Sequence, residues 1–117
     1  MALNRVLLQG RLVADVDLKT VGEDTKVATL RIAVDRDRKN KDGEREADFF
    51  SITAWRHSAE FVAQYFGKGD PIIVDGRLQY RTWKDDDGNT RSTVEVIADT
   101  FYFAGGKSGE KSDELPF

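Results

Sequence analysis

The sequence predicts an all-β fold with one helix, in which the helix lies between the third and fourth of five strands. Alternating apolar and polar residues dominate residues 3–103, whereas a helical repeat of apolar residues occurs once, near residues 58–66. After residue 104 the composition changes to Gly, Ser, Lys and Glu, which is typical of disorder. We therefore expect one domain over residues 1–104 and a disordered tail over residues 105–117.

The first two strands flank a polar segment. Residues 3–14 predict a long first strand, and Gly10 inside it indicates a bulge or bend that lets one strand serve two sides of a small barrel. The polar residues 15–24 are compatible with a short strand around residues 16–21. Residues 26–35 predict the second strand. Its more apolar face should turn toward the core and comprises Ala28, Leu30, Ile32 and Val34.

A long hairpin loop and the third strand follow. Residues 36–46 contain no apolar residue, and Asp42-Gly43 is a hairpin turn signal. Residues 47–55 predict the third strand. Its core face comprises Phe50, Ile52 and Ala54, and its other face comprises Phe49, Ser51, Thr53 and Trp55. The second of these faces combines two large aromatic rings with small hydroxyl side chains.

The helix comes next. Ser58 is positioned to cap its N-terminus, and Gly67 or Gly69 is expected to end it. The buried stripe predicted from the helical repeat is Ala59, Val62, Ala63 and Phe66.

Two further strands complete the domain. Pro71 opens the fourth strand, which runs to Trp83, and Asp87-Gly88 predicts the turn before the fifth strand at residues 90–103. In the fourth strand, one face comprises Ile72, Val74, Leu78 and Tyr80, and the other comprises Asp75, Arg77, Gln79, Arg81 and Trp83. Five strands with this helix placement predict the OB-fold, a five-stranded Greek-key barrel that binds oligonucleotides.

Composition narrows the class of protein. The 117 residues suffice for one small core, no run is apolar enough to span a bilayer, and the absence of cysteine excludes disulfides and thiolate chemistry. We expect a cytoplasmic protein. The net charge of −3 argues against a protein that coats polyanions by bulk charge. However, basic residues concentrate in residues 36–45 and 77–84.

No enzymatic site is predicted. His57 is the only histidine, so a multi-histidine metal site is excluded and one candidate general base remains, at a strand–helix junction where a structural role is expected. We expect no catalytic residue, no cofactor and no metal.

A binding face is better supported, because aromatic rings and arginines together suit stacking on bases and pairing with phosphates. The candidate stacking residues are Phe49, Trp55 and Trp83. The candidate phosphate contacts are Arg31, Arg36, Arg38, Lys39, Lys41, Arg77, Arg81 and Lys84.

Four segments together resemble the bacterial single-stranded DNA-binding protein family: NRVLLQGRL, ADFFSITAWRHSAEF, YFGKGDPIIVDGRLQYRTW and GNTRSTVEVIAD. The resemblance covers about residues 3–103 and implies an OB-fold that binds and protects single-stranded DNA during replication, recombination and repair. It maps the family's stacking aromatics onto Phe49, Trp55 and Trp83, although Phe49 stands where members often carry Trp, and Arg38 lies near another aromatic position. It also implies a homotetramer formed partly by pairing of first strands, at the nucleoid.

The ending DELPF matches the family separately. The resemblance implies that this acidic tip docks replication, recombination and repair proteins, through residues Asp113, Glu114, Leu115, Pro116 and Phe117. Only about ten residues precede the tip, so a compact member with a short linker is expected.

Three other classes of function make different predictions. An OB-fold adaptor between proteins would bind oligonucleotides weakly and without dependence on salt. An RNA-binding OB module would bind RNA as well as matched DNA, through the 2′-hydroxyl. An enzyme would show nuclease activity that disappears when His57 is replaced.

Overall fold

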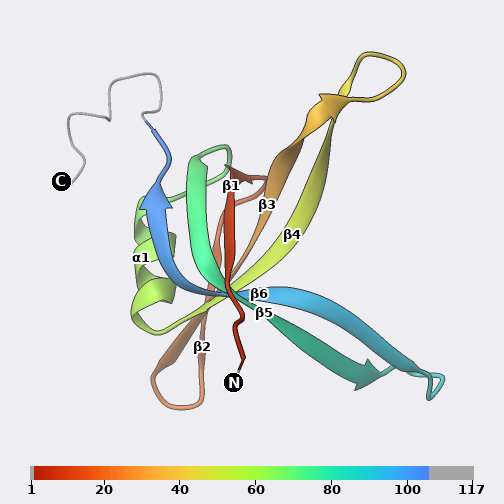
Figure 1. Cartoon of the computed structure of the whole chain (residues 1–117). Coiled ribbons are helices and arrows are strands. Elements are labelled where there is room, and N and C mark those ends of the chain that lie inside the picture. The colour runs from red at the N-terminus through yellow and green to blue at the C-terminus, as the bar shows by residue number, and fades with distance from the viewer. Residues whose placement is uncertain (1, 106–117) are drawn as a thin grey trace.

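The computed structural model describes residues 2–105 and confirms a mostly β fold with one helix, consistent with the OB-fold (Figure 1). Its elements are β1 (Val6–Leu12), β2 (Asp17–Val21), β3 (Thr25–Lys39), β4 (Arg45–Trp55), α1 (His57–Tyr65), β5 (Pro71–Lys84) and β6 (Thr90–Phe103). The short β2 occupies the polar segment before the predicted second strand. The helix therefore lies between β4 and β5, which correspond to the predicted third and fourth strands.

The strands form one sheet in the order β1-β5-β6-β4-β3-β2, and β1 also pairs with β3. The second pairing joins Arg11 to Ala33, so β1 serves two sides of a ring of strands as predicted. However, no bulge interrupts the pairing of β1 with β5 at Gly10. Glycine is needed there for a different reason, because a Cβ at this position would lie 2.3 Å from the Ala33 carbonyl oxygen.

Two hairpin arms extend beyond the ring, on the side away from α1 (Figure 1). One is formed by β3 and β4 and the other by β5 and β6. The prediction of a loop over residues 36–46 is wrong at both ends, because β3 continues to Lys39 and β4 begins at Arg45. The segment lacks apolar residues because the arm is largely exposed, and a strand of an exposed arm has no core-facing side.

The helix begins differently from the prediction. Arg56 occupies the N-cap position with φ 58° and ψ −122°, and no side chain caps the helix. The Ser58 hydroxyl instead donates a hydrogen bond of 2.8 Å to the Asp99 carbonyl oxygen. Ser58 therefore ties the first turn of α1 to β6 rather than capping the helix.

The helix ends at Tyr65 with Phe66 as its C-cap, so Gly67 directly follows the cap as expected, but it lacks the positive φ of a glycine cap. Phe66 turns to extended backbone, with φ −128° and ψ 145°, which directs its ring into the core.

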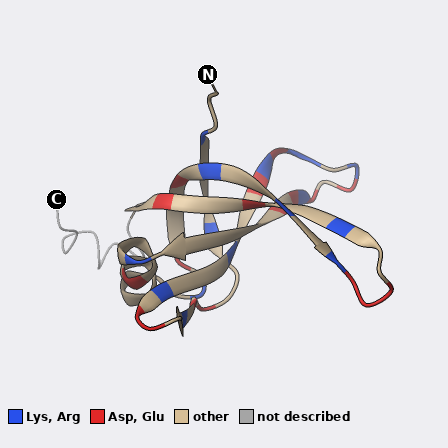
Figure 2. Cartoon of the chain, turned by 90° about the horizontal axis from the view of Figure 1, so that it is seen from below, with Lys and Arg blue, Asp and Glu red and all other residues tan. Residues whose placement is uncertain are grey.

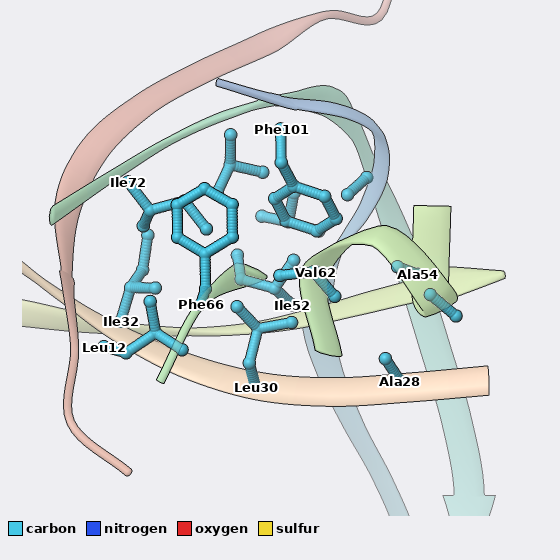
Figure 3. Packing of buried hydrophobic residues seen from close by; sticks show 14 residues of the cluster. Leu12, Ala28, Leu30, Ile32, Ile52, Ala54, Val62, Phe66, Ile72 and Phe101 are labelled. Carbon is cyan, nitrogen blue, oxygen red and sulfur yellow. The ribbon is translucent and has the colours of Figure 1, made fainter. Parts of the chain in front are cut away.

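The core lies inside the ring, beneath α1 (Figure 3). The predicted core faces of β3 and β4 are confirmed at Leu30, Ile32 and Ile52, which are at most 3% exposed. The largest fully buried side chains are Leu12, Ile32, Ile52, Val62, Ile72, Val74 and Val96. Leu78 and Tyr80 continue the alternation of β5 but are exposed, because they lie on the arm beyond the core. Within residues 2–105, no helix combines the length and apolarity needed to cross a bilayer.

Candidate nucleic-acid interface

The outer face of β4 carries two exposed aromatic rings. Phe49 is 52% exposed and Trp55 is 45% exposed, whereas Ile52 and Ala54 between them are buried on the inner face. Ser51 and Thr53 lie between the rings on the outer face, as the alternation predicts. The predicted stacking residues of β4 are thus brought to one solvent-accessible side of the sheet.

β3 adds a cation to this face. Arg31 pairs with Ser51 in the antiparallel register, so its side chain shares the outer face. Its guanidinium lies 5.3 Å from the centroid of the Phe49 ring, within the range of a cation–π interaction. Arg31 therefore places a positive charge beside the exposed Phe49 ring.

The β5–β6 arm continues the same face. β6 runs parallel to β4, and the Thr53 hydroxyl donates a hydrogen bond of 3.4 Å to Glu95 Oε2 on β6. Glu95 in turn faces Gln79 on β5. Because β5 alternates, Gln79 shares its face with Arg77, Arg81 and Trp83. One continuous outer surface therefore runs from β3 through β4 and β6 to β5.

Trp83 lies toward the far end of this arm. It is 43% exposed, and the Arg81 guanidinium lies 5.8 Å from its ring centroid. Tyr80, on the opposite face of the arm, hydrogen-bonds to the Ser92 hydroxyl at 3.0 Å. The arm thus presents a ring with two arginines on one side and a separate apolar face on the other.

A bulge sets the start of the arm. Asp75 pairs with Thr100 and Gly76 pairs with Ala98, so Asp99 is the extra residue on β6. A Cβ on Gly76 would lie 2.1 Å from the carbonyl oxygen of β6, so only glycine permits this approach of the two backbones. The bulge bends the arm where it leaves the ring.

The predicted phosphate contacts differ in their present partners. Arg36 pairs with Asp48 at 2.8 Å and with Glu46 at 3.1 Å, and Arg77 pairs with Asp99 at 3.5 Å. The hydrogen bond from Arg36 lowers the pKa of Asp48, and the same bond raises the pKa of Arg36. In residues 2–105, six predicted contacts form no ion pair: Arg31, Arg38, Lys39, Lys41, Arg81 and Lys84.

Charge on the arms is mixed (Figure 2). The end of the β3–β4 arm carries both signs, with five basic and three acidic residues over residues 36–45, whereas the tip of the β5–β6 arm is acidic at residues 85–87. Asp85 is engaged within its own turn, where Arg91 and the backbone N–H of Asn89 lower its pKa. No group of three or more potential metal ligands occurs in residues 2–105.

Three residues at this face were missed by the sequence reasoning. Arg45 donates hydrogen bonds to the Arg36 and Asp37 carbonyls, at 2.9 and 3.4 Å, where the β3–β4 register shifts. Arg56 follows Trp55 and has a positive φ, a backbone conformation that residues other than glycine rarely adopt, and no sequence signal predicts it. Glu95 could have been found, because alternation along residues 90–103 places it opposite Val94 and Val96.

Comparison with known proteins identifies the type of domain. The sequence model of the Single-strand binding protein family matches residues 3–104. The chain belongs to this family. The single-stranded DNA-binding protein of Oceanobacillus iheyensis is 43% identical over 113 residues, covering 94% of this chain and 70% of the relative. Single-stranded DNA-binding protein A of Bacillus subtilis is 43% identical over 107 residues, covering 92% and 62%.

A third relative is single-stranded DNA-binding protein 2 of Listeria monocytogenes, which is 45% identical over 101 residues, covering 86% of this chain and 63% of the relative. The chain thus spans about two thirds of the length of these relatives. The family match includes every predicted stacking and phosphate-contacting residue. The predicted partner-binding tip, Asp113 to Phe117, lies outside both the matched and the described residues.

Proposed function

We propose that this chain binds single-stranded DNA along the outer face of β3, β4, β6 and β5, with little preference for sequence. One observation carries the proposal: Phe49, Trp55 and Trp83 are each about half exposed on that continuous face, with arginines beside two of the rings. Stacking on an aromatic ring contributes about 1–3 kcal/mol per base and tolerates every base. The names of the relatives support this substrate.

The proposal favours a single strand over a duplex, because bases must be unstacked from their neighbours to reach the rings. The basic residues supply a salt-dependent contribution from phosphates, while the rings supply a contribution that persists at high salt. The binding role is non-catalytic, and it requires no metal or cofactor.

Tryptophan fluorescence during titration with oligo-dT tests the proposal, with duplex DNA of equal length as the control. Trp55→Phe and Trp83→Phe each leave one tryptophan, so each position is followed separately. We expect both to be quenched by the single strand, with affinity falling as salt rises. Absence of quenching with either DNA would favour a protein adaptor, and equal affinity for matched RNA would favour an RNA-binding module.

We also propose that four copies of this chain assemble. Two features of a single copy support assembly. In the described part of the chain, β1 is paired with β3 only at Arg11 and Leu12, which leaves that edge free over residues 6–10. The arm also exposes apolar side chains, with Leu78 44%, Tyr80 68% and Val94 50% exposed. Light scattering should give four times the 13.2 kDa protomer mass, and a protomer mass would refute assembly.

The tail carries the remaining proposal. Asp113 to Phe117 would recruit replication, recombination and repair proteins, because two acids followed by apolar residues suit a basic pocket with an apolar slot. Removing these five residues should abolish recruitment and leave DNA affinity equal or higher, because an anionic tail can compete with DNA. A clear loss of DNA affinity in the shortened chain would contradict this role. The proposal places the protein in the cytoplasm, at the nucleoid.

A further inference from the structure

Glu95 is an unexpected residue on a face proposed to bind DNA. It lies on β6, in the middle of the outer surface, with Thr53 of β4 on one side and Gln79 of β5 on the other. The aromatic rings of β4 therefore lie to one side of it, and Trp83 of β5 lies to the other. A strand that contacts both sets of rings must cross Glu95.

The carboxylate of Glu95 is available to a ligand. Its side chain is partly exposed, and within residues 2–105 it forms no ion pair. The hydrogen bond from Thr53 engages Oε2. That bond holds the side chain against the sheet and leaves Oε1 without a hydrogen-bond donor among the described residues.

The chemistry of a carboxylate restricts what it can bind here. An ionised carboxylate only accepts hydrogen bonds, and phosphate oxygens at neutral pH also only accept. A carboxylate at Glu95 therefore repels the phosphate backbone of the DNA strand. The exocyclic amino groups of cytosine, adenine and guanine are donors, and acidic side chains accept from cytosine N4 in DNA complexes. Thymine has no amino group, and its one ring N–H lies between two carbonyl oxygens that repel a carboxylate.

We infer that Glu95 is a specificity-determining residue, which accepts a hydrogen bond from the exocyclic amino group of a base held between the rings of β4 and Trp83. The inference rests on the proposed function and refines it. Stacking treats all bases alike, and Glu95 adds a modest discrimination against thymine at one position of the bound strand.

Replacing the carboxylate by an amide tests this inference. Glu95→Gln keeps the size of the side chain, removes the charge and adds a donor that suits the thymine O4 oxygen. Affinities for oligo-dC and oligo-dT of equal length are measured by fluorescence titration in the same buffer. We expect the ratio of dT affinity to dC affinity to rise about fivefold, the size of one hydrogen bond of discrimination.

Two further variants separate the hydrogen bond from charge. Glu60→Gln removes the same charge from an exposed position on the first turn of α1, and it should leave the ratio unchanged. Glu95→Asp keeps the charge but withdraws the oxygen by one methylene, so it should raise the ratio in the same direction as Glu95→Gln.

Other outcomes would overturn the inference. An equal gain of affinity for dC and dT in Glu95→Gln would mean that the carboxylate only repels phosphates. An unchanged affinity for both would mean that the strand does not reach it. Each result leaves the proposed function intact, whereas failure of the unaltered protein to bind either oligonucleotide refutes the proposed function itself.

Discussion

Replacing Trp83 by alanine separates DNA contact from folding. The side chain is 43% exposed on an arm that extends beyond the core, so its loss should lower the free energy of unfolding by no more than about 1 kcal/mol, the size of an exposed cation–π contact. Its larger effect should appear in DNA binding. The Arg81 guanidinium, 5.8 Å from the ring centroid, already covers part of the ring, which leaves room for one stacked base.

One stacked base sets the size of the effect. Stacking contributes about 1–3 kcal/mol, and because the ring is only partly free we expect the lower half of this range. Trp83→Ala should therefore weaken oligo-dT binding by about 1–2 kcal/mol, or five- to thirtyfold. The loss should persist at high salt, because stacking does not depend on released counterions.

Fluorescence anisotropy of a labelled oligo-dT measures this loss without relying on tryptophan emission. Tyr80→Ala is the matched control, because it removes a 68% exposed ring from the opposite face of the same arm. Light scattering of each variant checks that its mass is unchanged. Equal affinity of Trp83→Ala and the unaltered protein would refute the reasoning, as would a larger loss in Tyr80→Ala at unchanged mass.

Three further predictions concern stability and the arms. Gly76→Ala should lower the free energy of unfolding by about 1–3 kcal/mol in chemical denaturation, because its Cβ would lie 2.1 Å from the Ile97 carbonyl oxygen of β6. An unchanged denaturation midpoint would contradict this close approach. Asn4→Ala should weaken oligo-dT binding and change the melting temperature little. The Asn4 side-chain amide donates to the carbonyl and accepts from the N–H of Leu78, where the arm leaves the ring, so its loss frees the arm rather than the core. A lower melting temperature with unchanged oligo-dT affinity would contradict this. The pKa of Asp48 is lowered by Arg36, so their ion pair stabilises the arm fully above about pH 4 and is lost as the pH falls through that lowered value. Protection of residues 36–48 against hydrogen exchange, relative to the intrinsic exchange rate at each pH, should fall below about pH 4, and Asp48→Asn should abolish this acid dependence.

The faces of the strands could be predicted because alternation is a local property of extended backbone. It placed Phe49 and Trp55 on one side of β4 and Ile52 on the other, as the structure confirms. It could not predict where the core stops along a strand. Leu78 and Tyr80 continue the apolar pattern of β5, but they lie beyond the ring and are exposed.

Residues whose roles depend on tertiary contacts could not be predicted. Ser58 has the chemistry of a helix cap, yet its hydroxyl bonds a carbonyl of β6 that only the fold brings near. Arg45 donates hydrogen bonds to the Arg36 and Asp37 carbonyls at a shift in the β3–β4 register, and no residue in the sequence predicts that shift. Gly10 predicted a bulge or bend in β1, whereas the close approach of the β3 backbone is what requires a glycine there.

A chain with net charge −3 can bind a polyanion if its acids are neutralised locally. On the β3–β4 arm, Asp48 and Glu46 both pair with Arg36, and on the β5–β6 arm Asp85 pairs with Arg91. The lowered pKa of Asp85 follows from the Arg91 hydrogen bond and from the backbone N–H groups of its turn. These acids therefore offset the charge of particular arginines, and they leave cations without ion pairs, Arg31 and Arg81, beside the Phe49 and Trp83 rings. We infer that phosphates are bound chiefly by these unpaired cations, and that Arg36 serves first to join β3 to β4 through its ion pairs with Glu46 and Asp48.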